Sequence, residues 1–407
     1  MKSVSQYLFR AIVLLAITAS ISPLLANDWP RWLGPNGDNI APAGEPFEPD
    51  LNKWKIAWKS EVGLGYSSVA VVGERAYTMG NDGKGQETVF CLDALTGAVV
   101  WKHSYDAPLL PLMHTGGPNA TPTISGAKVV TLSKDGKVFC LSADKGAVLW
   151  KANLLEIFGI KLPDWGFASS PVIDGNKVLF CGGKACALDL ESGKTLWTSK
   201  TAYLPAGYAT SPVFDLNGKK FVAALDGKGL SILSAEDGSE IVRRPFKALF
   251  NMNATTPFIL AQGKRIFISC TVTSEMLGFD GTALTQIWAA KEMRNLMNNS
   301  VIQGGHIYGI SGEQQQPTDA LASINEETGK ENWSQPNIGY GTTIGIGKTL
   351  LILNESGELI TAAADPAKYT EISRRQVLGK VCWTTPTYAN GRIFLRNDQG
   401  NLVVLSQ

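Results

Sequence analysis

The sequence predicts an all-β fold, an eight-bladed β-propeller with four-stranded antiparallel blades. Three observations lead to this prediction. A motif with a small hydroxyl pair returns eight times, short apolar runs alternate every second residue between glycine turns, and the last repeat lacks a strand that the chain carries near its start. These features indicate four strands in each repeat and a ring that closes on itself.

The hydroxyl-pair motif sets the repeat length. Its fourth residue falls at positions 69, 122, 171, 212, 257, 301, 344 and 386, so the copies lie 41 to 53 residues apart. This spacing is typical of propeller blades and is well above that of leucine-rich repeats. Each motif, for example "NATPTI" (119–124) or "ATSPVF" (209–214), is predicted to begin the first strand of a blade.

Glycine turns separate the following strands. Turns such as "ISGAKVV" (124–130) and "ANGRIF" (389–394) join the first and second strands, and turns such as "KDGK" (134–137) and "ESGE" (355–358) precede the third. A string such as "CLDALTGAVVW" (91–101) then leads into a fourth strand that ends in tryptophan.

Closure of the ring follows from the two ends of the repeat region. The last copy stops at "LVVLSQ" (402–407), after its third strand, whereas "WKIAWKSEV" (54–62) carries a tryptophan strand before any first strand. We expect the early strand to complete the last blade, which removes the open sheet edges. Residues 54–407 are therefore predicted to form the propeller, and residues 27–53 an extended N-terminal segment.

Residues 1–26 resemble an export signal. A basic start precedes the apolar stretch "AIVLLAITASI" (11–21), and the segment ends on the small residue Ala26. The apolar stretch is shorter than a typical membrane-spanning helix. An uncleaved N-terminal anchor is the alternative. We predict an exported protein, periplasmic or secreted, with no membrane span after cleavage.

The bulk composition limits the partners. The 37 basic and 36 acidic residues leave a net charge of +1, which gives no reason to expect nucleic acid as a partner. The chain has six cysteines without a Cys-x-x-Cys pair and only three histidines, so no metal site is predicted. Whether any cysteines pair is left open by the sequence.

The string that contains Cys91 recurs in several blades. The position of Cys91 is elsewhere Cys, Ala or Ser, so it is predicted to be a small buried site rather than a reactive thiol. The glycine supplies a turn with positive φ, and the tryptophan is expected to cover the joint between neighbouring blades. The predicted docking tryptophans are Trp58, Trp101, Trp150, Trp197, Trp288 and Trp333.

This string resembles the docking motif of the pyrroloquinoline quinone (PQQ) repeat propellers, a superfamily that includes quinoprotein dehydrogenases and BamB-like outer-membrane assembly factors. The resemblance covers nearly all of residues 54–407. The segments "DWPRWLGPNGD" (28–38) and "PDWGFASSPVIDG" (163–175) further resemble exported PQQ-like propellers of the planctomycete type. The resemblance implies the fold and leaves the function open.

For the quinoprotein dehydrogenases, the resemblance implies PQQ and Ca²⁺ over the propeller axis, often against a disulfide between adjacent cysteines. This chain has no such cysteine pair, and its repeats lack the long inserts that build the cofactor chamber. No catalytic residue is therefore predicted, and PQQ with Ca²⁺ is kept as an alternative cofactor.

A ligand site is expected where the connections between blades converge at the mouth of the axial channel. Aromatic and amide side chains there could stack on a planar ligand or a sugar, or they could simply plug the axis. The candidate ligand-binding residues are Tyr66, Asn119, Trp165, Phe167, Tyr208, Asn253, Asn298, Tyr340 and Trp383.

Two long connections add further candidates. The segments "LLPLM" (109–113) and "LLEIFGI" (154–160) could meet a partner or pack onto their own blades. His114 and Asp164 are the acid–base candidates in these connections, but a lone histidine and a lone aspartate far apart in sequence make a weak catalytic pair.

These observations favour a binding or scaffold module in the periplasm or cell envelope, with an envelope protein or a small molecule as partner. A PQQ-dependent alcohol or sugar dehydrogenase-like oxidoreductase and a saccharide-binding protein are the alternatives. The sequence favours a role without catalysis, and it does not indicate the oligomeric state.

Overall fold

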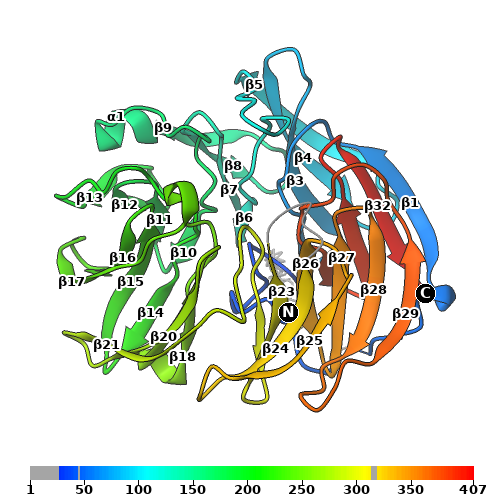
Figure 1. Cartoon of the computed structure of the whole chain (residues 1–407). Coiled ribbons are helices and arrows are strands. Elements are labelled where there is room, and N and C mark those ends of the chain that lie inside the picture. The colour runs from blue at the N-terminus through cyan, green and yellow to red at the C-terminus, as the bar shows by residue number, and fades with distance from the viewer. Residues whose placement is uncertain (1–26, 45, 313–318) are drawn as a thin grey trace, which may run out of the picture.

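The structure, a computed structural model, describes residues 27–44, 46–312 and 319–407. Eight sheets of four antiparallel strands surround a central axis (Figure 1). Contacts among β2, β6, β10 and β30 show that the first strands of neighbouring blades lie next to one another around the axis. The predicted eight-bladed propeller is confirmed.

The first four blades follow one another in chain order. Their strands are β2 (Ala70–Val72), β3 (Arg75–Asn81), β4 (Gln86–Asp93) and β5 (Val99–Asp106) in blade 1; β6 (Thr123–Ser125), β7 (Lys128–Leu132), β8 (Lys137–Ser142) and β9 (Val148–Asn153) in blade 2; β10 (Val172–Asp174), β11 (Lys177–Cys181), β12 (Ala185–Asp189) and β13 (Thr195–Thr198) in blade 3; and β14 (Val213–Leu216), β15 (Lys219–Asp226), β16 (Gly229–Ser234) and β17 (Glu240–Pro245) in blade 4.

Blades 5 to 8 repeat this order. Their strands are β18 (Phe258–Leu260), β19 (Arg265–Ser269), β20 (Ser274–Phe279) and β21 (Leu284–Ala290); β22 (Val301–Gln303), β23 (His306–Ser311), β24 (Ala320–Asn325) and β25 (Glu331–Pro336); β26 (Gly341–Ile346), β27 (Thr349–Asn354), β28 (Glu358–Ala363) and β29 (Glu371–Gln376); and β30 (Thr387–Ala389), β31 (Arg392–Arg396) and β32 (Asn401–Ser406) with β1 (Lys55–Glu61). The short helices are η1 (Leu51–Lys53), α1 (Leu154–Phe158), η2 (Leu249–Asn251) and η3 (Ala261–Gly263).

Strand β1 closes the ring. It pairs antiparallel with β32, from Lys55 opposite Ser406 to Glu61 opposite Asn401. In Figure 1 the blue β1 lies beside the red β32, so the two ends of the propeller sequence share one sheet. The expectation that an early strand completes the last blade is confirmed.

The predicted docking tryptophans lie at six joints between blades. Trp58 of blade 8 donates its indole N–H to the carbonyl of Ala94 in blade 1 at 3.0 Å. Its ring lies so close to Gly97 that a Cβ there would come within 2.5 Å of it. The other indoles bond in the same way from Trp101, Trp150, Trp197, Trp288 and Trp333 to Ala143, Leu190, Ala235, Glu326 and Asp365.

Each tryptophan stands opposite one residue of the third strand. Cys91 faces Trp101 across β4 and β5, and the ladder shifts by a bulge directly afterwards. Cys91 is fully buried, and all six cysteines are free. In blades 5 and 8 the same position holds Met276 and Val404, so it admits larger side chains than the Cys, Ala or Ser that we expected.

Blade 4 has no tryptophan at this position. Val242 takes its place opposite Ile232. The joint with blade 5 is filled by an aromatic cluster, in which the rings of Phe221 and Phe279 meet edge to face with centroids 5.1 Å apart and Phe214 packs against both. Apolar burial therefore replaces the indole hydrogen bond at this joint.

Blade 7 has Ser373 at the tryptophan position, and the N-terminal segment fills the space instead. The backbone N–H of Leu51 donates to Ser373 Oγ at 3.0 Å. Leu51 is fully buried, and the ring of Trp54 packs edge to face on Tyr388 of blade 8. Residues before β1 thus fill the joint between blades 7 and 8 that the repeat leaves without a tryptophan.

Residues 28–41 cross the axis on the face that carries the turns between first and second strands. Trp29 pairs with Val71 of blade 1, and Trp32 Nε1 donates to Thr256 Oγ1 before blade 5 at 3.0 Å. Ile40 pairs with Gly345 of blade 7. This segment, which we call the axial cap, covers one end of the axis.

The predicted signal peptide at residues 1–26 lies outside the described residues. In the part of the chain that the structure describes, no helix is long and apolar enough to cross a membrane.

The docking role of the tryptophans predicts unequal effects of two neighbouring substitutions. Trp101→Ala should lower the free energy of unfolding by about 3 to 5 kcal/mol, because it removes a buried ring and the hydrogen bond to Ala143. Cys91→Ala should cost about 1 kcal/mol or less, since it deletes one small group. Urea denaturation measures both values. A loss from Cys91→Ala as large as that from Trp101→Ala would contradict the docking role.

Candidate functional site

The mouth face, opposite the axial cap, carries the connections between blades and holds a row of aromatic rings. Trp383 stacks on Tyr66 with centroids 5.6 Å apart and an interplanar angle of 21°. Tyr66 meets His114 edge to face at 5.5 Å, and His114 stacks on Trp165 at 5.4 Å. Each of these rings comes from a different connection, and each is half-buried. A flat ring or a sugar could stack on such a row.

Tyr208 extends this row, because its hydroxyl hydrogen-bonds the backbone of Trp165. Burial raises the pKa of the Tyr208 hydroxyl to about 12. The row therefore contains four predicted site residues, Tyr66, Trp165, Tyr208 and Trp383. His114 also belongs to the row. The sequence suggested acid–base chemistry for His114 together with Asp164, and Asp164 is exposed on the surface.

The other predicted site residues lie differently. Asn253 and Asn298 are buried, and their amides donate to backbone carbonyls, Asn253 to Asp226 at 2.8 Å and Asn298 to Ile310 at 2.9 Å. The buried Tyr340 hydroxyl accepts the N–H of Met297 at 3.1 Å. These three side chains hydrogen-bond backbone groups and so fix the connections on which they lie.

Two further candidates lie among blades 1 to 3. Phe167 is buried and packs against Phe158 and the glycines at positions 136 and 182, so it belongs to the core. Asn119 is half-buried next to Pro118, whose carbonyl accepts the N–H of Tyr66.

A buried polar cluster lies beneath the aromatic row. Lys134 and Glu87 are each only 1% exposed. The Lys134 amine lies 3.4 Å from His114 Nε2, and Tyr105 donates its hydroxyl hydrogen to Glu87. Burial lowers the pKa of Lys134 to about 7, although the charge of Glu87 raises it, and burial raises the pKa of Glu87 to about 7. Burial also lowers the pKa of His114 to about 4.

Arg396 of blade 8 holds the base of the mouth. Its guanidinium is fully buried and donates to the carbonyls of Ser67 at 2.8 Å, Met79 at 2.6 Å and Gly63 at 2.9 Å. Burial lowers its pKa to about 9. Because the guanidinium is occupied by backbone oxygens, it fixes blade 8 to blade 1 directly below Tyr66.

The connections on the mouth face also expose apolar side chains. Met113 is 90% exposed and Phe250 is 88% exposed. The two predicted hydrophobic segments differ in exposure. In residues 109–113, Leu112 and Met113 are exposed. In residues 154–160, Leu154 and Phe158 of α1 are buried. The second segment packs onto its own blades.

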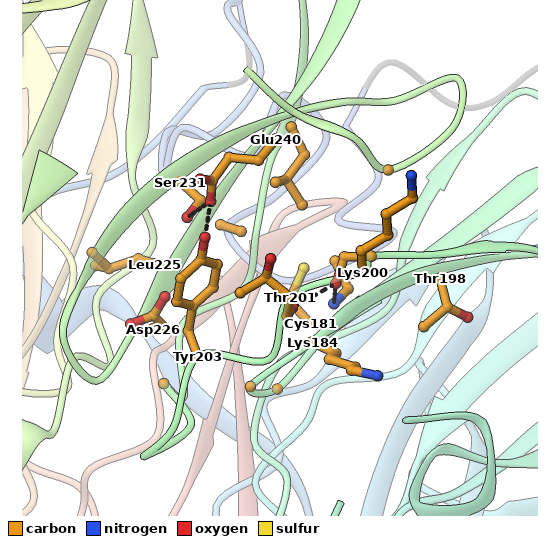
Figure 2. A pocket seen from close by; sticks show the side chains of 18 of the residues that line it. Cys181, Lys184, Thr198, Lys200, Thr201, Tyr203, Leu225, Asp226, Ser231 and Glu240 are labelled. Carbon is orange, nitrogen blue, oxygen red and sulfur yellow. Dashed lines mark hydrogen bonds between the residues drawn. The ribbon is translucent and has the colours of Figure 1, made fainter. Parts of the chain in front are cut away.

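A pocket of about 240 Å³ opens between blades 3 and 4 (Figure 2). On the blade 4 side, Asp226 accepts two hydrogen bonds from Arg243 at 2.6 and 2.8 Å, and the guanidinium lies 3.6 Å from the ring centroid of Tyr203. Ser231 donates to Glu240 at 3.0 Å, and Tyr203 donates to the same carboxylate. The polar groups of this wall are paired with one another.

Sequence reasoning missed this pocket as well as Lys134, Glu87 and Arg396. The pocket lies at the joint between blades 3 and 4, where Trp197 keeps its hydrogen bond to Ala235, so the repeat pattern gave no signal for it. Lys134 lies in the glycine turn "KDGK", which repeats elsewhere as an ordinary turn, so the pattern gave no signal.

Comparison with known proteins identifies the family to which the chain belongs. Residues 53–151 and 85–335 match the family described as outer membrane protein assembly factor BamB. The chain belongs to the BamB family. It is therefore a PQQ-like repeat β-propeller, as its docking motif implies. No curated protein sequence matches the chain significantly.

Solved structures share the fold of this BamB-family chain. BamB from Moraxella catarrhalis is 18% identical, with a TM-score of 0.63, covering 87% of this chain and 98% of that one. Quinohemoprotein alcohol dehydrogenase from Comamonas testosteroni is 12% identical, with a TM-score of 0.70, covering 93% and 80%. A europium-containing methanol dehydrogenase is 9% identical, with a TM-score of 0.58, covering 94% and 98%. At these identities the likeness shows the fold alone.

A calcium ion of the quinoprotein kind needs several oxygen ligands around one point. Among the described residues, no three His, Cys, Asp or Glu side chains gather as ligands of one ion. The carboxylates near the mouth have other partners: Glu355 meets Trp383 Nε1 at 3.3 Å, and Asp398 accepts the N–H of Val381 at 3.2 Å. We therefore derive no step through calcium or PQQ.

The buried pair Glu87 and Lys134 predicts a pH dependence of folding stability. The pKa of Glu87 is raised to about 7 from about 4.3 in the unfolded chain, so its contribution is full below pH 4.3 and is lost as the pH rises through 7. The pKa of Lys134 is lowered to about 7 from about 10.4 in the unfolded chain. Its contribution to folding stability is therefore full above pH 10.4 and is lost as the pH falls through 7. Together they predict least stability near neutral pH.

Urea unfolding of wild type, Glu87→Gln and Lys134→Met at pH 5, 7 and 9 measures this effect. Glu87→Gln should remove the loss between pH 5 and 7, and Lys134→Met should remove the gain between pH 7 and 9. Three parallel profiles would show that neither group titrates as stated.

Proposed function

We propose that this BamB-family propeller is an exported scaffold of the cell envelope that binds a protein partner through its mouth face. The family match supports the scaffold role. The observation that carries the proposal is the pair of exposed apolar side chains, Met113 and Phe250, on connections of that face.

The backbone at both positions supports a binding role. Met113 has φ 62° and Phe250 has φ 54°, in the left-handed region that bulky L-residues rarely adopt. Strained backbone of this kind persists where the surrounding structure enforces it, and it concentrates at functional sites. An apolar side chain turned outward gains nothing from solvent, whereas a protein partner would bury it.

The connections of the mouth face also support one another. The ideal Cβ of Gly166 would lie 3.2 Å from Leu110 Cδ1, and that of Gly183 would lie 3.0 Å from Leu204 Cδ2 and 3.5 Å from Ile160 Cδ1. Next to Leu204, the Pro205 carbonyl accepts the N–H of Gly227 at 3.1 Å. Contacts therefore run from the connection after blade 1 to that after blade 3, which favours a continuous surface.

Photo-crosslinking tests the proposal. With p-benzoylphenylalanine at position 113 or 250, we expect a crosslink to one envelope protein. Phe250→Asp should weaken the position 113 crosslink about 30-fold, the effect of losing a hot spot of about 2 kcal/mol. The matched control is Leu149→Asp, since Leu149 is exposed on the outer strand β9 and should have no effect. Equal crosslinking in all variants would show that the mouth face is not the binding surface.

The second candidate is a quinoprotein-type oxidoreductase. The aromatic row favours it, because Tyr66, Trp383 and Trp165 present ring faces on which a planar cofactor could stack. When bound, PQQ would supply two-electron oxidation of an alcohol or sugar.

Incubation with PQQ and Ca²⁺ tests this candidate through cofactor absorbance and dye-linked oxidation. We expect cofactor binding that Trp383→Ala weakens at least tenfold and that Phe167→Tyr, a change in the core, leaves unaltered. Absence of binding at micromolar cofactor would rule out this candidate and would leave the scaffold proposal intact.

A further inference from the structure

The buried contact between His114 and Lys134 defines the protonation of both groups. The backbone N–H of Gly116 donates to His114 Nδ1 at 2.9 Å, so this nitrogen carries a lone pair and no hydrogen. A neutral imidazole has one N–H, which must therefore be on Nε2. His114 is neutral in this environment, because burial holds its pKa near 4.

The amine of Lys134 faces that Nε2–H at 3.4 Å. An ammonium group has three donors and no lone pair, so it could not accept this hydrogen, whereas an uncharged amine can. Among the neighbours of Lys134, Glu87 on β4 is the group whose negative charge would favour a charged lysine. Burial of Glu87 favours its uncharged, protonated form. The neighbouring Asp135 carboxylate is paired with Lys137. The hydrogen bonds therefore require an uncharged Lys134.

An uncharged lysine amine is a nucleophile, and this one lies beneath rings that can hold a flat ligand. The ring of His114, stacked between Tyr66 and Trp165 in the aromatic row, separates the amine from the mouth. His114 is half-buried, and the amine reaches the surface of the row only when the imidazole rotates and gives up the hydrogen bond from Gly116.

We propose that Lys134 is a site of imine formation with a carbonyl compound that carries a flat ring, such as an aromatic aldehyde. The nitrogen lone pair forms a bond to the carbonyl carbon. The carbonyl oxygen takes up the two hydrogens lost from the nitrogen and leaves as water, so the step needs no oxidant or reductant. An uncharged amine has no charge that would favour a phosphate or carboxylate instead. This proposal does not depend on the protein-binding role proposed above.

Reductive labelling of the full chain tests it. Pyridoxal and cyanoborohydride are added at pH 7.5, and peptide mass spectrometry then measures labelling at each lysine. Exposed lysines, with a pKa near 10.4, are about one part in a thousand uncharged at this pH, whereas most of Lys134 is uncharged. We expect Lys134 to be labelled at least tenfold faster than Lys145, whose side chain is 81% exposed.

Four variants sharpen the test. Lys134→Met should lose the fast label, and Lys151→Met, at an exposed position on β9, should keep it. His114→Ala should accelerate labelling of Lys134 because it removes the cover, and His103→Ala, on β5, should leave the rate unchanged. Melting curves confirm that each variant is folded.

The pH profile and the imidazole tautomer give independent readouts. The labelling rate at Lys134 should be nearly flat from pH 8 to 9.5, whereas the rate of an ordinary exposed lysine amine should rise about tenfold per pH unit. Nitrogen NMR of His114 should show the hydrogen on Nε2. Labelling of Lys134 no faster than Lys145 in both wild type and His114→Ala, or a hydrogen on Nδ1, would overturn the proposal.

Discussion

The pairing of β1 with β32 is the constraint on which the rest of the molecule depends. In a propeller each blade packs only on its two neighbours, so an open ring would leave two blades with an exposed side and unpaired edges. The antiparallel ladder from Lys55–Ser406 to Glu61–Asn401 joins two strands that lie at opposite ends of the propeller sequence. Once the ring is closed, the first strands of all blades are held around one axis, and the connections after each fourth strand meet on one face.

Closure also places the residues that precede β1. Leu51 enters the joint between blades 7 and 8, where Ser373 replaces the tryptophan of the repeat. The axial cap then spans the ring from Val71 in blade 1 to Gly345 in blade 7. The same N-terminal segment therefore completes a blade, fills a joint and covers one end of the axis. These three roles leave the mouth face as the side on which ligands or partners can approach the centre.

The fold could be predicted from the sequence because its signals are local. Alternating strands, glycine turns and the hydroxyl pair recur within each repeat, and the missing strand of the last copy indicated the closure. The axial cap could not be predicted, since its contacts join residues that are more than 200 positions apart, as between Trp32 and Thr256. The pocket beside Tyr203 depends in the same way on how two blades meet.

The candidate site was predicted only in part, and the reason lies in the unequal lengths of the connections. A repeat pattern places one residue per blade at the mouth, but it cannot show whether the side chain turns to solvent or to its own backbone. Tyr66 and Trp383 turn to the mouth, whereas Asn253 and Asn298 bond backbone carbonyls.

The long connections before blades 2 and 3 make the difference around Lys134. The first brings His114 over the amine, and the second lies on its stem, where a Cβ at Gly166 would come within 2.3 Å of Lys134 Cγ. The reactivity proposed for Lys134 therefore depends on these two insertions, because burial removes the solvation that keeps a lysine charged.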